Sequence, residues 1–247
     1  MQNIVIQAAD LTKSYRNGGE ASLVLRGVHL SVARGECVFL VGPSGSGKTT
    51  LLSILGCVLS ADTGQLDILG VDARQLSAAG QAHFRRERIG FVFQRFHLFN
   101  ALTAVENVSV PLSLLNWPKA RARERALELL QLVGLEERAS YRVTRLSMGQ
   151  RQRVAFARAL AANPDLILAD EPTASLDSES GLKAMHALKD LCHELQKTVI
   201  VVTHDPRIYS LADRILRLHD GRVVGDSRGL RRPVKRQEPG IGRQAAA

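Results

Sequence analysis

The chain has 247 residues, of which 45% are hydrophobic and 23% charged, which is typical of one larger globular domain or of a core with a small insertion. The formal net charge is +9, but the last twenty residues alone hold six Lys or Arg against one Glu, so the overall charge is a poor argument for nucleic-acid binding. No apolar run approaches the roughly 18 to 20 residues that a membrane-spanning helix needs, and the first residues do not resemble a signal peptide, so we expect a cytosolic protein.

Short apolar, β-branched runs alternate with stretches in which apolar residues recur every three or four positions. Strands are predicted at residues 4–8, 23–32, 36–41, 64–69, 89–93, 166–169, 198–202, 214–218 and 222–224. Helices are predicted at residues 48–55, 119–133, 149–161 and 182–195. This alternation indicates an α/β protein with a mostly parallel sheet.

Two segments depart from the alternation. Between about residues 95 and 162 the strand signals vanish, which predicts a helical subdomain inserted into the α/β core. Residues 228–247 are rich in Arg, Pro, Gly and Gln without periodicity, so we predict a disordered basic tail that is either simply solvated or in contact with anionic lipid. The three cysteines, Cys37, Cys57 and Cys192, are far apart in sequence and are expected to be reduced and mostly buried.

The run Gly-Pro-Ser-Gly-Ser-Gly-Lys-Thr at residues 42–49 has the spacing G-x-x-x-x-G-K-T and lies between a predicted strand and a predicted helix. Glycines let the backbone curl so that successive N–H groups point at phosphate oxygens, and the N-terminus of the helix adds a positive field. We predict that Lys48 reaches the β- and γ-phosphates and that Thr49 ligates Mg²⁺. The nucleotide-binding residues of the loop would be Gly42, Pro43, Ser44, Gly45, Ser46, Gly47, Lys48, Thr49 and Thr50. The loop alone leaves kinases and GTPases open.

Two predicted strands end at polar residues. The strand 166–169 is followed by Asp170 and Glu171, and parallel strands deliver ligands to a site at their carboxyl ends. We expect Asp170 to hold Mg²⁺ and Glu171 to polarise the attacking water. The strand 198–202 is followed by His204, which is either an ordinary histidine at a strand end or a contact to the γ-phosphate; its place beside a further strand of the sheet favours the contact.

Residues 146–153 read Leu-Ser-Met-Gly-Gln-Arg-Gln-Arg and precede a predicted helix and then the strand with the two carboxylates. With this run the sequence resembles the ABC ATPase family, whose hallmark is an LSGGQ-type signature upstream of the second nucleotide motif. The resemblance extends from about residue 4 to residue 226. It implies a RecA-like P-loop NTPase core with a parallel sheet, an N-terminal antiparallel β subdomain and an inserted α-helical subdomain at about residues 95–162, all within one ATP-binding domain at residues 1–227.

The resemblance also implies roles for single residues outside the phosphate loop. Tyr15 would stack on adenine, the alternative being an ordinary surface tyrosine. Gln94 would link Mg²⁺ and the catalytic water to a membrane partner, and His204 would be the switch histidine. Asp177 would lie in the loop that crosses between subunits.

The signature run would complete the ATP site of a second copy of the chain. Its residues Ser147, Met148, Gly149 and Gln150 would contact the γ-phosphate bound by the other subunit, so that two chains clamp two ATP molecules between them. Met148 replaces the more usual glycine of the signature. Because Ser147 and Gly149 match the signature, we expect the chain to keep its ATPase activity.

Residues 89–94, 102–108, 111–112 and 168–173 resemble one branch of the family, which holds the ATPases of macrolide exporters, lipoprotein-release complexes, heterocyst-glycolipid exporters and the cell-division ABC subunit. The branch implies a separate membrane permease that docks near Gln94, export or extraction of a lipid, lipoprotein or drug, a periplasmic adaptor reached through the permease, and a place at the cytoplasmic face of the inner membrane. Phe96, Leu98 and Phe99 would belong either to the docking surface or to the core.

Other members of the same family remain alternatives. A regulatory ABC ATPase in cell division or signalling would have the same catalytic residues, and an importer ATPase is also compatible with the motifs. A soluble ABC ATPase that acts on DNA or ribosomes is disfavoured, because this chain has one cassette and no coiled-coil insertion. No nucleic-acid partner is expected.

Overall fold

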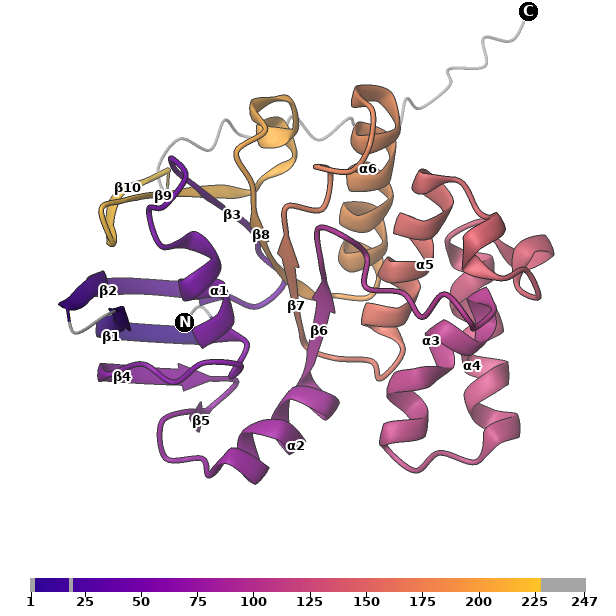
Figure 1. Cartoon of the computed structure of the whole chain (residues 1–247), viewed down its shortest axis with the longest axis horizontal. Helices are drawn as coiled ribbons and strands as arrows, with labels where there is room; N and C mark the ends of the chain where they lie inside the picture. Colours follow the sequence, from indigo (N-terminus) through magenta and orange to yellow (C-terminus); the bar gives the residue numbers. More distant parts are fainter. Residues whose placement is uncertain (1–2, 18–19, 228–247) are drawn as a thin grey trace, which may run out of the picture.

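Two β-sheets and a group of helices beside the second sheet organise the chain in the computed structural model (Figure 1). The structure describes residues 3–17 and 20–227. The predicted tail at residues 228–247 lies outside the described residues. Within the described part of the chain, no helix has the length and apolar character needed to cross a bilayer.

The first sheet is antiparallel and has the strand order β2-β1-β4-β5. Its strands are β1 (Ile4–Asn17), β2 (Glu20–Ala33), β4 (Thr63–Ile68) and β5 (Val71–Asp72). The antiparallel subdomain is therefore confirmed. The predicted strands at 4–8 and 23–32 were too short, since β1 and β2 form one long hairpin.

The second sheet has the order β10-β9-β3-β8-β7-β6. Its strands are β3 (Cys37–Val41), β6 (Ile89–Val92), β7 (Leu166–Asp170), β8 (Thr198–Val202), β9 (Arg214–His219) and β10 (Arg222–Asp226). Five of these strands run parallel, and β10 pairs antiparallel with β9 at one edge. The carboxyl ends of β3, β7 and β8 therefore lie side by side along the same end of these central strands, where the predicted site lies.

The central strands are buried on both faces because their side chains alternate between two hydrophobic clusters. On β3, Phe39 and Val41 pack with the helical group, whereas Val38 and Leu40 pack with the antiparallel sheet and α1 (Lys48–Leu55). The same alternation recurs on β7 and β8. This double burial explains why these strands read in the sequence as continuous apolar runs.

The segment at residues 95–162 is helical, as predicted from the loss of strand signals. It contains α3 (Ala104–Leu114), α4 (Lys119–Leu132) and α5 (Met148–Leu160), with short 3₁₀ turns at Glu136–Arg138 and Val143–Arg145. α6 (Ser178–Glu194) covers the same face of the sheet, and a 3₁₀ segment at Pro206–Leu211 follows β8. These helices share one hydrophobic cluster with the sheet, so the insertion does not have a core of its own.

Two helices were not singled out from the sequence. α2 (Ala78–Arg88) buries only Phe84, so it shows no apolar periodicity. α3 begins with a capping box in which the side chains of Thr103 and Glu106 each accept a hydrogen bond from the other residue's backbone N–H. The Thr-x-x-Glu pattern would have predicted the start of this helix. All three cysteines are free and buried, which confirms that expectation.

Candidate functional site

The loop between β3 and α1 contains two glycines, Gly42 and Gly47, at which any larger residue would force neighbouring atoms to move. Gly42 has φ 157°, and a Cβ at this position would lie 2.0 Å from the carbonyl oxygen of Leu218. Gly47, the N-cap of α1, has φ 99°, where L-residues are strained. The sequence thus folds this loop tightly against β9, with the N-terminus of α1 directed at the loop's concave side.

Lys48 is the cation of this loop. Its side chain is buried with only 8% of the residue exposed, and its ammonium donates to the carbonyl oxygens of Gly42 and Pro43 at 2.9 and 2.8 Å. No carboxylate forms an ion pair with it within the described residues. The buried hydroxyl of Ser46 likewise has no hydrogen-bond partner there. A buried cation and an unsatisfied hydroxyl in one loop suit a polyanionic ligand such as a phosphate chain.

Oxygen ligands converge beside Lys48. The Thr49 hydroxyl lies 3.4 Å from a carboxylate oxygen of Asp170 at the end of β7. Burial, followed by the neighbouring carboxylate of Glu171, raises the pKa of Asp170. A carboxylate that is desolvated in this way is stabilised by a hard cation, so this pair fits Mg²⁺, which prefers oxygen ligands.

Glu171 and His204 form the other side of the site. Nδ1 of His204 lies 2.7 Å from Oε1 of Glu171, whose side chain is only 14% exposed. Glu171 has φ 46°, a left-handed conformation that costs about 1–3 kcal/mol in a non-glycine residue. Its backbone N–H donates to the carbonyl oxygen of Val202 at 2.9 Å, which holds this conformation. The carboxylate is thus fixed by the backbone of the neighbouring strand.

Gln94 follows β6 and is tied to another loop of the predicted site. Its backbone carbonyl accepts a hydrogen bond of 2.9 Å from the hydroxyl of Ser175, two residues before Asp177. The aromatic residues after Gln94 differ in burial: Phe96 is buried, whereas Phe99 is 52% exposed. Leu98 is partly buried and packs against the core.

A cavity of about 710 Å³ gathers most of the predicted nucleotide-site residues. It is lined by Val24, Gly42, Pro43, Ser44, Gly45, Gly47, Lys48, Thr49, Thr50, Gln94, Glu171 and His204. Tyr15 lies on β1, 37% exposed, and is not among these lining residues. Val24 of β2 does line the cavity, although the sequence offered no sign of it.

The signature residues line a second cavity, of about 640 Å³, that shares no lining residue with the first. Ser147, Met148, Gly149 and Gln150 line it together with Asp177. Ser147 is the N-cap of α5 and forms a capping box with Gln150. Met148 is 46% exposed at the first turn of the helix. Asp177 caps α6, and its hydrogen bond from the Ser180 N–H lowers its pKa.

A parallel sheet whose strand ends carry a glycine-rich loop, a buried lysine and paired carboxylates defines a P-loop nucleotide-binding protein. Residues 25–174 match the ABC transporter family. The macrolide export ATP-binding/permease protein MacB of Vibrio parahaemolyticus is 44% identical over 227 residues, which are 92% of this chain and 35% of that protein. MacB of Photorhabdus laumondii is 45% identical over 225 residues, 91% of this chain and 35% of that protein.

Solved structures agree with this match. The dimeric structure of the ATP-binding cassette MJ0796 in a post-hydrolysis state, bound to ADP and Pi, superposes with a TM-score of 0.81 at 43% identity and covers 90% of this chain and 97% of that one. The cbiO1 structure from Clostridium perfringens, described as part of an ABC transporter complex, gives a TM-score of 0.82 at 28% identity. The match covers 91% of this chain and 88% of that one.

This chain therefore belongs to the ABC transporter family, as an ATP-binding cassette. It spans about 35% of the length of the MacB proteins that it matches.

Proposed function

We propose that the chain binds ATP and Mg²⁺ in the first cavity and hydrolyses the ATP. The observation that carries this proposal is the convergence of the buried Lys48, the carboxylate of Glu171 and the ring of His204 on one cavity at the strand ends. Lys48 would neutralise phosphate charge, and Glu171 would orient and polarise the attacking water. His204 is within hydrogen-bond reach of that carboxylate and would hold its orientation.

Thr49, Asp170 and Gln94 are the residues that would hold the Mg²⁺ ion. When bound, the ion supplies positive charge that offsets the negative charge of the phosphates. The hydroxyl of Thr49 and the carboxylate of Asp170 already lie side by side, and the cation would favour the ionised form of Asp170.

The second cavity supports a two-chain arrangement. Because the signature cavity and the nucleotide cavity share no residue, the signature of one chain would act on the nucleotide of another. The N-terminus of α5 offers backbone N–H groups and the Ser147 hydroxyl to an anion there. The dimeric state of the related cassette is a further support for this two-fold clamp.

Closure and opening of this clamp would drive a separate membrane permease at the cytoplasmic face of the inner membrane. The similarity to macrolide export proteins over 92% of the chain supports export or extraction of a lipid, a lipoprotein or a drug. A periplasmic adaptor would be engaged through the permease. Gln94 would carry the coupling, since it lines the nucleotide cavity and begins the loop that leads to the helical segment.

The clamp is tested by replacing Ser147 with a bulky side chain. Ser147→Trp should abolish ATP-dependent dimerisation, measured by light scattering with a non-hydrolysable ATP analogue. Ser140→Trp is the matched control, because Ser140 is also exposed but lines neither cavity. A dimer that persists in Ser147→Trp contradicts the two-chain site.

A further inference from the structure

The side chain of Gln94 lines the nucleotide cavity without bonds of its own to hold it there. It forms no hydrogen bond with any residue that the structure describes, whereas its backbone carbonyl accepts the 2.9 Å hydrogen bond from the Ser175 hydroxyl. The place of this side chain at the cavity therefore depends on the conformation of the backbone around it.

The backbone after Gln94 forms two tight turns. The Phe96 N–H donates to the carbonyl oxygen of Phe93 at 2.9 Å and closes a turn with Gln94 and Arg95 at its centre. The His97 N–H donates to the carbonyl oxygen of Arg95 at 2.6 Å. Phe96 and His97 have φ of 59° and 48°, so two successive non-glycine residues are left-handed. Such residues are strained and persist only where their surroundings hold them.

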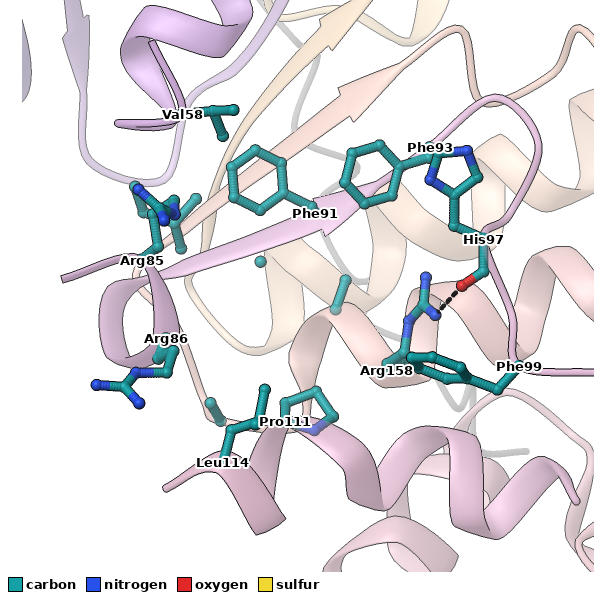
Figure 2. A pocket seen from close by; sticks show the side chains of 14 residues that line it. Val58, Arg85, Arg86, Phe91, Phe93, His97, Phe99, Pro111, Leu114 and Arg158 are labelled. Carbon is teal, nitrogen blue, oxygen red and sulfur yellow. Dashed lines mark hydrogen bonds between the residues drawn. The ribbon is translucent and has the colours of Figure 1, made fainter. Parts of the chain in front are cut away.

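Arg158, in the last turn of α5, bonds to this backbone. Its guanidinium donates to the carbonyl oxygens of His97 and Phe96 at 2.5 and 2.6 Å, and Figure 2 shows the side chain reaching the His97 carbonyl. Within residues 3–17 and 20–227, no other donor bonds to either oxygen. A planar guanidinium with several donors thus holds both strained residues at once.

The charge of Arg158 is not shared with an acid. Its side chain is half-buried, and burial lowers the pKa of its guanidinium. Arg158 lines a pocket of about 420 Å³ whose lining contains two further arginines and no carboxylate. Hydrogen bonds from a partly desolvated cation are stronger than those of a solvated one, because water competes less for the acceptors. The two bonds to the turn are therefore the main contacts of this cation.

The side chains of the turn are anchored on the opposite side, to β6. The His97 ring stacks on the Phe93 ring at 4.8 Å, and Phe93 stacks on Phe91 of β6 at 5.6 Å. Figure 2 shows the three rings following one another from the strand into the loop. The turn is thus held to β6 through its rings and to α5 through its carbonyls, with Gln94 between Phe93 and the strained residues.

We infer that Arg158 is a positioning residue for the ATPase reaction, which holds the Phe96–His97 backbone so that the Gln94 side chain is presented to the nucleotide cavity. The inference rests on the proposed function, because Gln94 is one of the residues that would hold Mg²⁺ there. Arg158 does not itself line that cavity. Its loss should therefore change the Mg²⁺ requirement of the reaction and leave the binding of nucleotide by the phosphate loop intact.

The test compares two substitutions of Arg158 in the purified full chain. Arg158→Met removes the donors but keeps a long, unbranched side chain, and Arg158→Lys keeps a charged donor. Arg85→Met is the matched control, because Arg85 lines the same pocket and also donates to a backbone carbonyl, that of Cys57.

Three quantities are measured on each variant, with thermal unfolding alongside. The first is backbone hydrogen–deuterium exchange at Phe96 and His97 without nucleotide, by mass spectrometry. The second is the Mg²⁺ concentration that gives half-maximal ATP turnover. The third is the affinity for a fluorescent ATP analogue without Mg²⁺.

In Arg158→Met, exchange at Phe96 and His97 should be about tenfold faster or more, because the turn loses both bonds to its carbonyls. The Mg²⁺ concentration for half-maximal turnover should rise by about fivefold or more. The affinity for the analogue should stay within about twofold, since Lys48 and its loop are untouched. Arg158→Lys should show smaller changes in the first two quantities, and Arg85→Met should show none.

Unchanged exchange at Phe96 and His97 in Arg158→Met overturns the inference even if the variant melts at a lower temperature, since Arg158 would then serve only the packing of α5. Faster exchange with an unchanged Mg²⁺ requirement also overturns it, because Gln94 would then not depend on this turn. If Arg158→Met does not fold, the same two criteria apply to Arg158→Lys. A wild-type chain without ATP turnover at any Mg²⁺ concentration contradicts the proposed function itself.

Discussion

Gln152 is the residue whose replacement tests the packing most directly. It is fully buried on α5, and neither Oε1 nor Nε2 of its side chain has a hydrogen-bond partner in the described part of the chain. Each buried polar group left unsatisfied costs about 1–3 kcal/mol. Methionine has a similar volume, and volume-conserving swaps cost less than about 1.5 kcal/mol. The two unsatisfied groups together cost about 2–6 kcal/mol, and subtracting up to about 1.5 kcal/mol for the swap leaves about 0.5 kcal/mol or more, so we expect Gln152→Met to raise the free energy of unfolding by at least that amount.

The measurement is equilibrium unfolding in urea, with thermal unfolding as a second readout. The melting temperature should rise by roughly 2–4 °C for each kcal/mol in a chain of this size. Gln150→Met is the matched control: Gln150 accepts a hydrogen bond from the Ser147 N–H in the capping box, so the same substitution two residues earlier should cost about 0.5–1.5 kcal/mol. A Gln152→Met variant that unfolds more easily than the wild type would mean that the amide is hydrogen-bonded in solution and is not an unsatisfied buried group.

Three further outcomes follow from the geometry. Gly42→Ala should weaken ATP binding by about tenfold or more in a fluorescent-nucleotide titration, because its Cβ would lie 2.0 Å from a carbonyl oxygen, whereas Gly80→Ala meets nothing closer than 3.4 Å and should bind normally. Burial raises the pKa of the Cys37 thiol from 9.0 to about 12, so Cys37 should react with Ellman's reagent about 10³-fold more slowly in the native than in the unfolded chain. Burial alone would raise the pKa of Asp165, but Arg34 and Arg88 hold it below its ordinary value; Asp165→Asn should therefore cost about 1 kcal/mol at pH 7 in urea unfolding.

The pH dependence of the Asp165 effect has a definite sign. A carboxyl whose pKa is lowered by folding stabilises the chain above its unfolded pKa, about 3.9, and loses that contribution as the pH falls through the lower folded value. The difference between wild type and Asp165→Asn should therefore shrink as the pH is lowered from 7 toward 3. A difference that grows with acidity would show that Arg34 and Arg88 do not act on this carboxyl.

The sequence predicted the fold well where both faces of a strand are buried. β3, β7 and β8 were found within a residue at each end, because double burial leaves an unbroken apolar run. The β1–β2 hairpin was found only in part: its outer half, from Thr12 to Arg16 on β1, is half-buried or exposed, so the apolar pattern fades there although the ladder continues. β5, with two residues, gave no pattern.

The candidate site was predictable where backbone geometry forces residue type. The phosphate loop needs glycines at fixed spacing, and the paired carboxylates directly follow the apolar run of β7. Both features can therefore be predicted from the sequence alone. The roles of Ser175 and Arg158 were not, because each binds a backbone carbonyl of a loop distant in sequence, and no residue type marks a carbonyl. Val24 is the same case, since only the packing of the two sheets brings it to the cavity.

Glu171→Gln tests whether Glu171 activates water for the hydrolysis of ATP held between two chains. ATP turnover and light scattering are measured on the purified wild type and variant with MgATP. The variant should lose turnover, since an amide cannot accept the proton of the water, and it should accumulate as an ATP-bound dimer. Unchanged turnover in Glu171→Gln, with a monomer in the presence of ATP, would contradict both the assignment of the carboxylate and the two-chain clamp.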